Sequence, residues 1–117
     1  MNNDTYLNGF IENNLGIIKK YNDVPGSKHF MVGCGVEFLI TPRNNDESGD
    51  YYILKANLNS PLINTSWNHP MFEKKFPSEF RLYTYLEYGL TGIYESIIKK
   101  IHERMNSYDI SLTNVVQ

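Results

Sequence analysis

The side chain best suited to covalent chemistry is the only cysteine of the chain, Cys34, which stands between Gly33 and Gly35. Two flanking glycines would leave the thiol accessible, and a base such as His29 or His69 would have to lie nearby to form the reactive thiolate. The surrounding sequence does not match a nucleophile motif. We therefore interpret Cys34 as a structural cysteine in a strand, with the catalytic role as the alternative.

A metal site would have to use the same cysteine together with the histidines. These candidates are far apart in the sequence: His29, Cys34, His69 and His102. They lack the paired spacing that places two ligands on one turn or one loop. The sequence therefore predicts no metal site and no cofactor. A phosphate-binding loop is not expected either, because the residues after Cys34 are typical of a strand, whereas a phosphate cradle needs a helix N-terminus.

Acidic side chains cluster in the polar segment NNDESGD, where Asp46, Glu47 and Asp50 lie close together. The twelve-residue calcium-loop pattern is absent, and turn chemistry alone produces such a composition. An exposed acidic turn could also contact a basic partner at little desolvation cost. Asp46, Glu47 and Asp50 are therefore candidates for partner binding.

Large aromatic side chains supply the other candidates for a binding surface. Trp67 and His69 lie in the segment NTSWNHP, and Tyr83 and Tyr85 lie in FRLYTYLEY. Trp and Tyr are frequent at interfaces because they combine a large contact area with a polar atom, and His titrates near neutrality. The alternative is that Trp67 covers the hydrophobic core and that a second layer covers the tyrosines.

Apolar spacing predicts the helices that position these residues. From Leu82 to Met105 the apolar residues recur every three or four positions, which predicts one continuous helix that begins after Ser78. The alternation in residues 80–88 is also compatible with a strand followed by a shorter helix. A first amphipathic helix is predicted from Asp4 to Tyr21.

Strand patterns occupy the middle and the end of the chain. Residues 29–41 and 51–58 predict an antiparallel hairpin across the acidic turn, and residues 108–116 predict a closing strand. Residues 60–77 contain three prolines and show no sustained period, so we expect a long irregular loop there. The chain, residues 1–117, is thus predicted to be a single α+β domain. In it, a small antiparallel sheet is packed on one face by an N-terminal helix and a long C-terminal helix.

Composition limits the class of protein further. The net charge of −2 argues against a generic nucleic-acid binder, and one cysteine cannot form an internal disulfide. The N-terminus lacks the basic start and the apolar run of a signal peptide, so we expect a cytoplasmic protein that does not interact with membranes. The abundance of Asn, Ile, Lys and Tyr suggests an AT-rich coding sequence, as in many low-GC bacteria and their mobile elements.

The sequence favours a small non-enzymatic protein that binds another protein, since no catalytic pattern emerges. We expect a specific inhibitor from a bacterial mobile element: an immunity protein or antitoxin that neutralises a toxin, or a phage protein that blocks a host defence enzyme. The predicted mechanism is occlusion of the partner's active site. In it, Asp46, Glu47 and Asp50 face basic groups, while Trp67, Tyr83 and Tyr85 supply contact area.

Two other functions stay open. A ligand-binding or catalytic domain could hold a pocket between the long helix and the sheet, with Cys34, Glu37 or His69 inside it. A nucleic-acid-binding module could use the basic residues that accompany the tyrosines: Lys74, Lys75, Arg81, Lys99, Lys100 and Arg104. Glutamates among these residues favour a mixed-charge surface instead. A homodimer through exposed tyrosines is compatible with every one of these functions.

Overall fold

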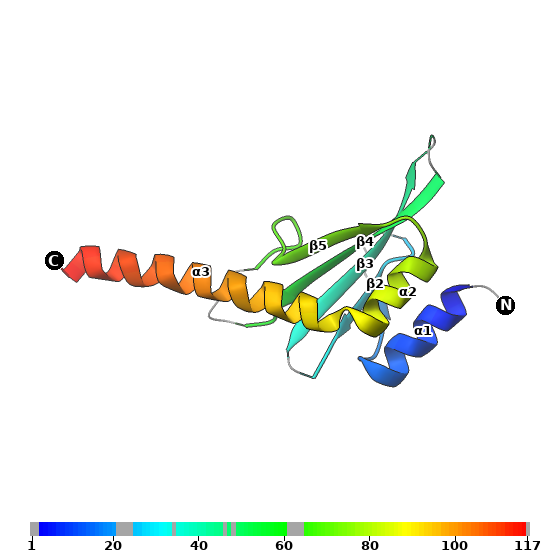
Figure 1. Ribbon diagram of the computed structural model, residues 1–117, viewed down its shortest axis with the longest axis horizontal. Helices are drawn as coiled ribbons and strands as arrows, with labels where there is room; N and C mark the ends of the chain where they lie inside the picture. Colours follow the sequence, from blue (N-terminus) through cyan, green and yellow to red (C-terminus); the bar gives the residue numbers. More distant parts are fainter. Residues whose placement is uncertain are drawn as a thin grey trace.

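The strand-like and helical stretches of the sequence form an antiparallel sheet with helices packed against it (Figure 1). The computed structural model describes residues 3–20, 25–33, 35–45, 47, 49–60 and 65–116, with the backbone alone for residues 3–5, 20, 45 and 105–116. The elements in chain order are α1 (Asn3–Asn14), β1 (Lys19–Lys20), β2 (Lys28–Met31), β3 (Val36–Asn45), β4 (Gly49–Leu58), β5 (Phe72–Phe76), α2 (Glu79–Tyr88) and α3 (Leu90–Val116). The α+β prediction is confirmed.

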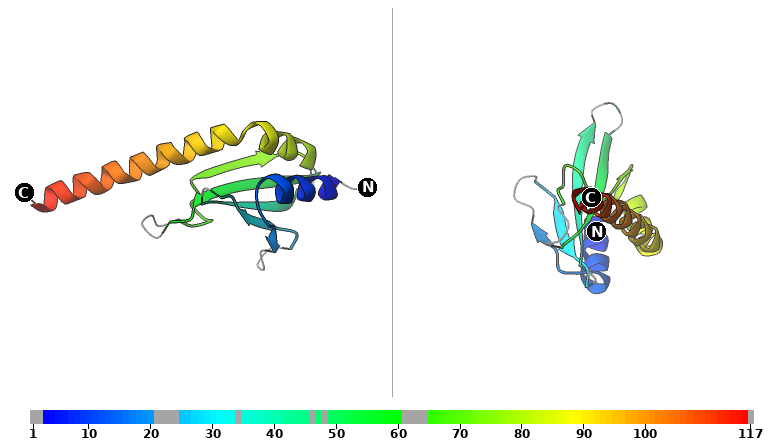
Figure 2. Two further views of the ribbon diagram at one scale, coloured as in Figure 1. Left: turned by 90° about the horizontal axis from the view of Figure 1, so that it is seen from below. Right: turned by 90° about the vertical axis from the view of Figure 1, so that its left-hand side faces the viewer.

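The sheet is a meander in which each strand pairs antiparallel with its sequence neighbour, in the order β1-β2-β3-β4-β5. Its longest pair is the β3–β4 hairpin, in which Val36 lies opposite Leu58 and Asn45 lies opposite Gly49. Gly49 has a φ of 84°, a conformation that favours glycine, and the hairpin turns at this end. Helices α1, α2 and α3 lie on one face of the sheet, where two helices were predicted (Figure 2).

The core lies between this face and the helices. Alternation along the strands points Phe38, Leu54 and Ala56 inward, and none of these side chains is exposed. The helices contribute the apolar stripe that the sequence predicts, and its buried members are 0–2% exposed: Leu82, Leu86, Ile93 and Ile97. α1 adds Leu7 and Ile11, which are 1% and 0% exposed. Burial of each large aliphatic side chain contributes roughly 1.5–3 kcal/mol.

The predicted continuous helix from Leu82 to Met105 is wrong in one respect, because α2 and α3 are separated by Gly89. The Gly89 amide donates to the Tyr85 carbonyl over 2.6 Å, with φ −109° and ψ 6°. A Cβ at this position would lie 2.7 Å from that oxygen and 3.0 Å from the Tyr85 ring. Glycine therefore ends α2 here. The strand alternative for residues 80–88 is also wrong.

The start of α2 is as predicted. The Ser78 hydroxyl accepts a hydrogen bond from the Arg81 amide over 3.2 Å, so Ser78 is the N-cap. Glu79 follows in the first turn, where the helix dipole favours an acidic side chain.

Two strand predictions need correction. Residues 29–41 form parts of β2 and β3, which pair with each other and bring Phe30 and Phe38 into a stacked contact at 5.2 Å. Gly35, with a φ of 88°, lies in the turn between them. Because the residues on both sides are typical of strands, the sequence gives no clear sign of this turn. Residues 60–77, predicted to be irregular, contain β5, a five-residue strand too short to show a clear period.

The C-terminal strand predicted for residues 108–116 is wrong, because α3 continues to Val116. No glycine or proline follows Gly92, and an established helix extends at little cost until a residue interrupts it. At 27 residues, α3 spans about 40 Å and extends beyond the sheet (Figure 1). Among the described residues, no helix combines the length and the apolar character needed to cross a membrane.

α1 ends at Asn14, earlier than the predicted Tyr21. The chain then turns so that Lys19 pairs with His29 at the start of the sheet. Gly16 makes this turn possible, since a Cβ there would overlap the carbonyl oxygen of Met31. The close approach of two backbones therefore decides where the helix stops.

Candidate binding surface around helix α2

The acidic candidates that the structure describes lie at the end of the β3–β4 hairpin, where Glu47 is between the strands and Asp50 is in β4 opposite Asn44. Glu47 and Asp50 are exposed, and Asp46 lies outside the described residues. Asp50 lines a hollow of about 330 Å³ together with Tyr51, Lys75 and Pro77. The Lys75 ammonium lies 4.0 Å from the centre of the Tyr51 ring, a cation–π contact that holds it beside the hairpin.

Trp67 and His69 lie near the opposite end of β4. The Lys55 ammonium donates to the Trp67 carbonyl over 2.8 Å, and the half-buried Trp67 ring meets the His29 ring edge-on at 6.1 Å. His69 is exposed. Lys55 alternates with the inward-facing Leu54, so Trp67 packs on the face of the sheet away from the helices.

Asn57 fixes this segment to the sheet, and the sequence analysis did not single it out. Its side-chain amide donates to the Ser66 carbonyl over 3.1 Å, and its side-chain oxygen accepts from the Met71 amide over 2.9 Å. Asn57 is only 3% exposed. The sequence does contain a sign of this role, because Asn57 stands inside a strand of mostly large residues. A buried side-chain amide there needs hydrogen-bond partners, which the backbone can provide.

The residues suggested for a pocket between the long helix and the sheet are not together there. Glu37 lies on the other face, where its carboxylate is 3.7 Å from the His29 ring nitrogen Nε2. Cys34 lies outside the described residues. The space beneath α3 holds the buried side chains of Ile93 and Ile97.

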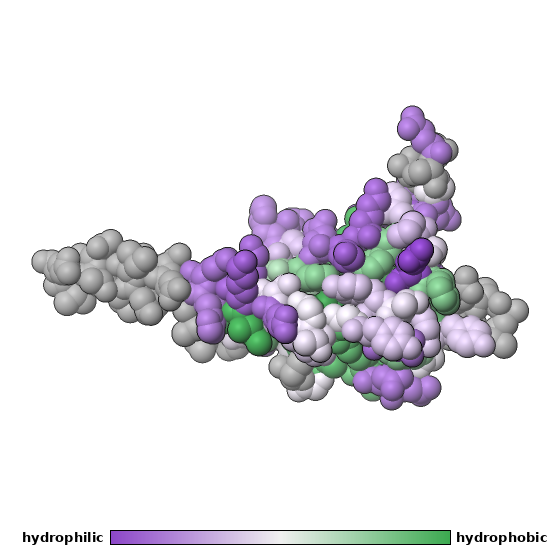
Figure 3. Space-filling view, viewed as in Figure 1, coloured by the Kyte–Doolittle hydropathy of each residue, from purple (hydrophilic) through white to green (hydrophobic). Residues whose placement is uncertain are grey.

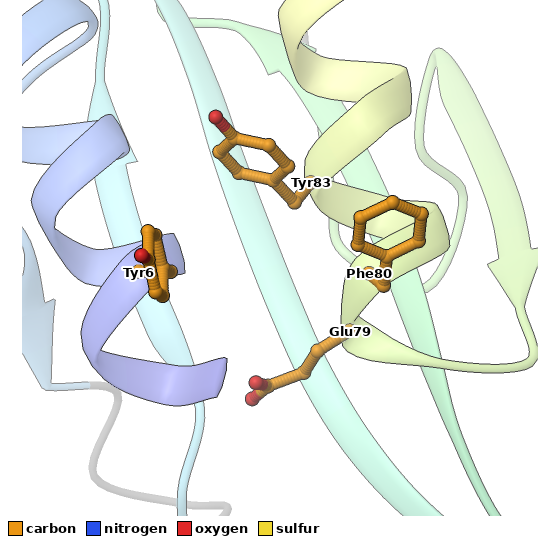
Figure 4. A pocket seen from close by; sticks show the side chains of 4 residues that line it. All are labelled: Tyr6, Glu79, Phe80 and Tyr83. Carbon is orange, nitrogen blue, oxygen red and sulfur yellow. The ribbon is translucent and has the colours of Figure 1, made fainter. Parts of the chain in front are cut away.

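Tyr83 lies on the flank of α2 that faces α1. Its ring meets Phe10 edge-on at 5.2 Å, and Figure 4 shows it directed toward α1. Beside it is a hollow of about 220 Å³ lined by Tyr6, Glu79, Phe80 and Tyr83, which we call the aromatic hollow. Tyr6 and Phe80 are 64% and 66% exposed, so the hollow presents apolar area to solvent.

Tyr85 lies on the opposite flank, which faces β5. Its ring stacks on Phe72 at 6.2 Å and contacts Phe76 at 5.1 Å, while the Lys74 ammonium lies 5.4 Å from its centre. Tyr85, Phe76 and Lys74 border a groove of about 550 Å³ between β5 and α2. We call it the basic groove and define it by Lys74, Lys75, Arg81, Tyr85 and Tyr88.

The charge of the basic groove is one-sided. Its described lining holds three cations and no carboxylate, although the chain as a whole carries a net charge of −2. Within the described residues, Lys74, Lys75 and Arg81 make no ion pair. Figure 3 shows hydrophilic side chains along the edge formed by β5 and again over the middle of α3, with paler and apolar ones between them.

Burial raises the pKa of both tyrosine hydroxyls, and a neighbouring carboxylate adds to the shift of one of them. Burial raises the pKa of the Tyr83 hydroxyl above its ordinary value of 10.0, and the neighbouring Glu87 carboxylate raises that pKa further. Burial alone raises the pKa of Tyr85. Both hydroxyls therefore stay protonated at neutral pH, where each keeps one O–H donor.

The structure thus distributes the predicted site residues over separate places. Tyr83 and Tyr85 lie on the two flanks of α2, Asp50 lies next to the basic groove at Lys75, and Trp67 with His69 lies about 23 Å along β4 from the hairpin turn. Lys75, Arg81 and Tyr88 were not among the predicted site residues. Lys75 and Arg81 did belong to the basic residues noted in the sequence.

Comparisons with protein families, with curated proteins and with solved structures find no match. In the described part of the chain, no three His, Cys, Asp or Glu side chains gather as metal ligands would.

Proposed function

We propose that this chain is a non-enzymatic protein that binds a partner protein through the two flanks of α2. The observation that carries the proposal is where exposed hydrophobic side chains gather. Of the six large hydrophobic side chains that are exposed among the described residues, three line the aromatic hollow or the basic groove: Tyr6, Phe80 and Tyr88. Exposed aromatic groups gathered beside polar ones are typical of protein interfaces.

The mode of action that we propose is occlusion of a partner enzyme. The described linings of the two sites supply contact area and fixed charge, but neither holds a histidine or a cysteine that could act as a base or a nucleophile. A toxin or a host defence enzyme, the partner classes expected from the sequence, stays the proposed target. Glu47 and Asp50 would meet basic groups of that target beside the groove.

Capture of the partner by matched variants tests the proposal. Phe80→Asp with Tyr88→Asp places charges in the proposed interface, whereas Ile17→Asp with Ile98→Asp places them at exposed apolar positions elsewhere. Tyr88 and Ile17 are 78% and 77% exposed, so both variants should remain folded. The tagged chain and the Ile17/Ile98 variant should retain one stoichiometric partner from a lysate of source cells, and the Phe80/Tyr88 variant should lose it.

Two further results decide the outcome. The purified partner should lose its enzymatic activity when the wild-type chain is added and keep it with the Phe80/Tyr88 variant. Failure to capture a stoichiometric partner, or equal capture by the two double variants, would contradict the proposal. Far-UV circular dichroism confirms that each variant is folded before the comparison is made.

A further inference from the structure

β5 forms an edge of the sheet beside the basic groove. Among the described residues it is the last strand in the sheet order and pairs with β4 alone, from Tyr52 opposite Phe76 to Ala56 opposite Phe72. Its central residues, Glu73, Lys74 and Lys75, are exposed. Half of the backbone groups of an edge strand point away from the sheet, where another extended chain can pair with them.

The lysines of β5 point to opposite faces of the sheet. Lys74 lies opposite Leu54, a core residue, and so faces the helices, where its ammonium reaches Tyr85. Lys75 lies opposite Ile53 and faces the other way, toward Tyr51. A strand added beside β5 would therefore meet a cation on each of its faces.

α2 completes the groove on the helical side. Arg81, Tyr85 and Tyr88 recur at helical spacing along one flank, so they form a wall opposite β5. Arg81 is exposed and its guanidinium is suited to bind a carboxylate with two hydrogen bonds. The exposed ring of Tyr88 offers contact area for an apolar side chain.

We propose that the basic groove binds an extended acidic segment of the partner protein, which adds to the sheet as a strand next to β5. The inference rests on the proposed function and names the partner chemistry of that surface. Adjacent acidic residues in the segment point to opposite faces of the new strand. One meets Lys75 and the other meets Lys74 and Arg81, while apolar residues lie against Tyr85 and Tyr88.

The competing explanation is that the lysines protect the edge. Lysine on an edge strand discourages pairing with other chains, and Lys74 and Lys75 could have that role alone. Protection of the strand edge and recognition of an acidic segment differ in what they require of α2. Recognition of carboxylates uses Arg81 as well, which lies across the groove on α2, whereas edge protection needs only the residues of β5.

A labelled peptide tests the inference directly. The probe is a fluorescein-labelled heptapeptide with two adjacent glutamates between valines, and binding is followed by fluorescence anisotropy. Lys75→Glu with Arg81→Glu should weaken binding about tenfold or more, because two attractions become repulsions. Lys99→Glu with Lys100→Glu, the same change of charge at exposed positions of α3, should leave the affinity unchanged. Equal loss in both variants would overturn the site.

Altered probes separate strand pairing from charge alone. A peptide with lysines in place of the glutamates should not bind. One with prolines in place of the valines should bind at least tenfold more weakly, since it keeps only the amide hydrogens of the two glutamates and loses most of its donors to β5. Equal binding of the proline peptide would overturn strand addition. A single-stranded oligonucleotide that bound the groove while the acidic peptide did not would overturn the inference in favour of nucleic acid.

The inference and the proposed function can fail separately. If the acidic peptide does not bind but the Phe80/Tyr88 variant still loses the captured partner, the partner chemistry named here is wrong and protein binding by α2 stands. If the peptide binds and competes with the captured partner, both are supported. Competition should disappear in the Lys75/Arg81 variant.

Discussion

The two flanks of α2 differ although they belong to one helix of ten residues. Tyr83 and Tyr85 are two positions apart and reach different neighbours: Tyr83 meets Phe10 of α1, and Tyr85 meets Phe72 and Phe76 of β5. The aromatic hollow contains an acidic residue, Glu79, while the described lining of the basic groove contains cations. The helix supplies residues to both, and the element that packs beside each flank decides its character.

The difference also concerns the backbone. On one side α1 satisfies its own hydrogen bonds as a helix, so that flank offers side chains only. On the other side β5 is an edge strand whose outer backbone groups are available for pairing. The aromatic hollow is therefore suited to bury apolar side chains of a partner, and the basic groove is suited to align an extended chain.

The largest expected effect comes from loosening α1. Ile11 is 0% exposed in the core, so Ile11→Ala should lower the free energy of unfolding by about 2–5 kcal/mol. Ile17, which is 77% exposed, provides the matched control, and Ile17→Ala should change it by about 0.5 kcal/mol or less. Urea denaturation measures both. If the two substitutions lowered the free energy of unfolding equally, α1 would not be packed against the flank of α2 that carries Tyr83.

A smaller effect is expected at the junction of α2 and α3. Gly89→Ala would push a Cβ against the Tyr85 carbonyl and ring, so we expect a loss of about 1–3 kcal/mol and a change in the near-UV circular dichroism of the basic groove. A Cβ at Gly92, on α3, meets no atom within 4 Å. Gly92→Ala should instead stabilise the fold by about 0.5–1 kcal/mol. A gain from both substitutions would show that Gly89 is not needed to seat Tyr85.

Much of the fold could be predicted from the sequence because its signals are local. The stripe from Leu82 to Ile97 faces the core, Ser78 caps α2, and residues 51–58 alternate as expected. The errors lie where a local signal was short or mixed. β5 has five residues, and the turn between β2 and β3 joins two strands of similar composition. Residues 108–116 alternate like a strand but continue a helix that nothing interrupts.

The candidate site was harder to predict because it depends on contacts between distant elements. Lys75 and Arg81 were visible as basic residues, but only the packing of β5 beside α2 brings them to one groove. Of the glutamates that are close in the sequence, Glu79 lines the aromatic hollow, and Glu73 lies in β5 opposite Lys55, on the face of the sheet away from the helices. Trp67 was noted for its residue type, whereas its position follows from the hydrogen bonds of Lys55 and Asn57. A linear sequence does not reveal such pairings.

The smallest effect that separates the two flanks is their response to alkaline pH. Both tyrosine pKa values are raised in the folded chain, so below pH 10.0 both states keep the proton and stability is complete. Above it the unfolded chain loses the proton first, and the free energy of unfolding falls as the pH rises through the folded pKa.

Glu87 distinguishes the two tyrosines in this pH range. It contributes to the raised pKa of Tyr83, while burial alone raises that of Tyr85. Glu87→Gln should therefore lower the pKa of Tyr83 toward its ordinary value and leave that of Tyr85 unchanged, because the charge that opposes ionisation is removed from one flank only. Carbon-13 NMR of labelled tyrosines, assigned with Tyr83→Phe and Tyr85→Phe, measures both titrations. An equal shift of the two tyrosines would show that the flanks share one electrostatic environment, and the contrast between the aromatic hollow and the basic groove would then be wrong.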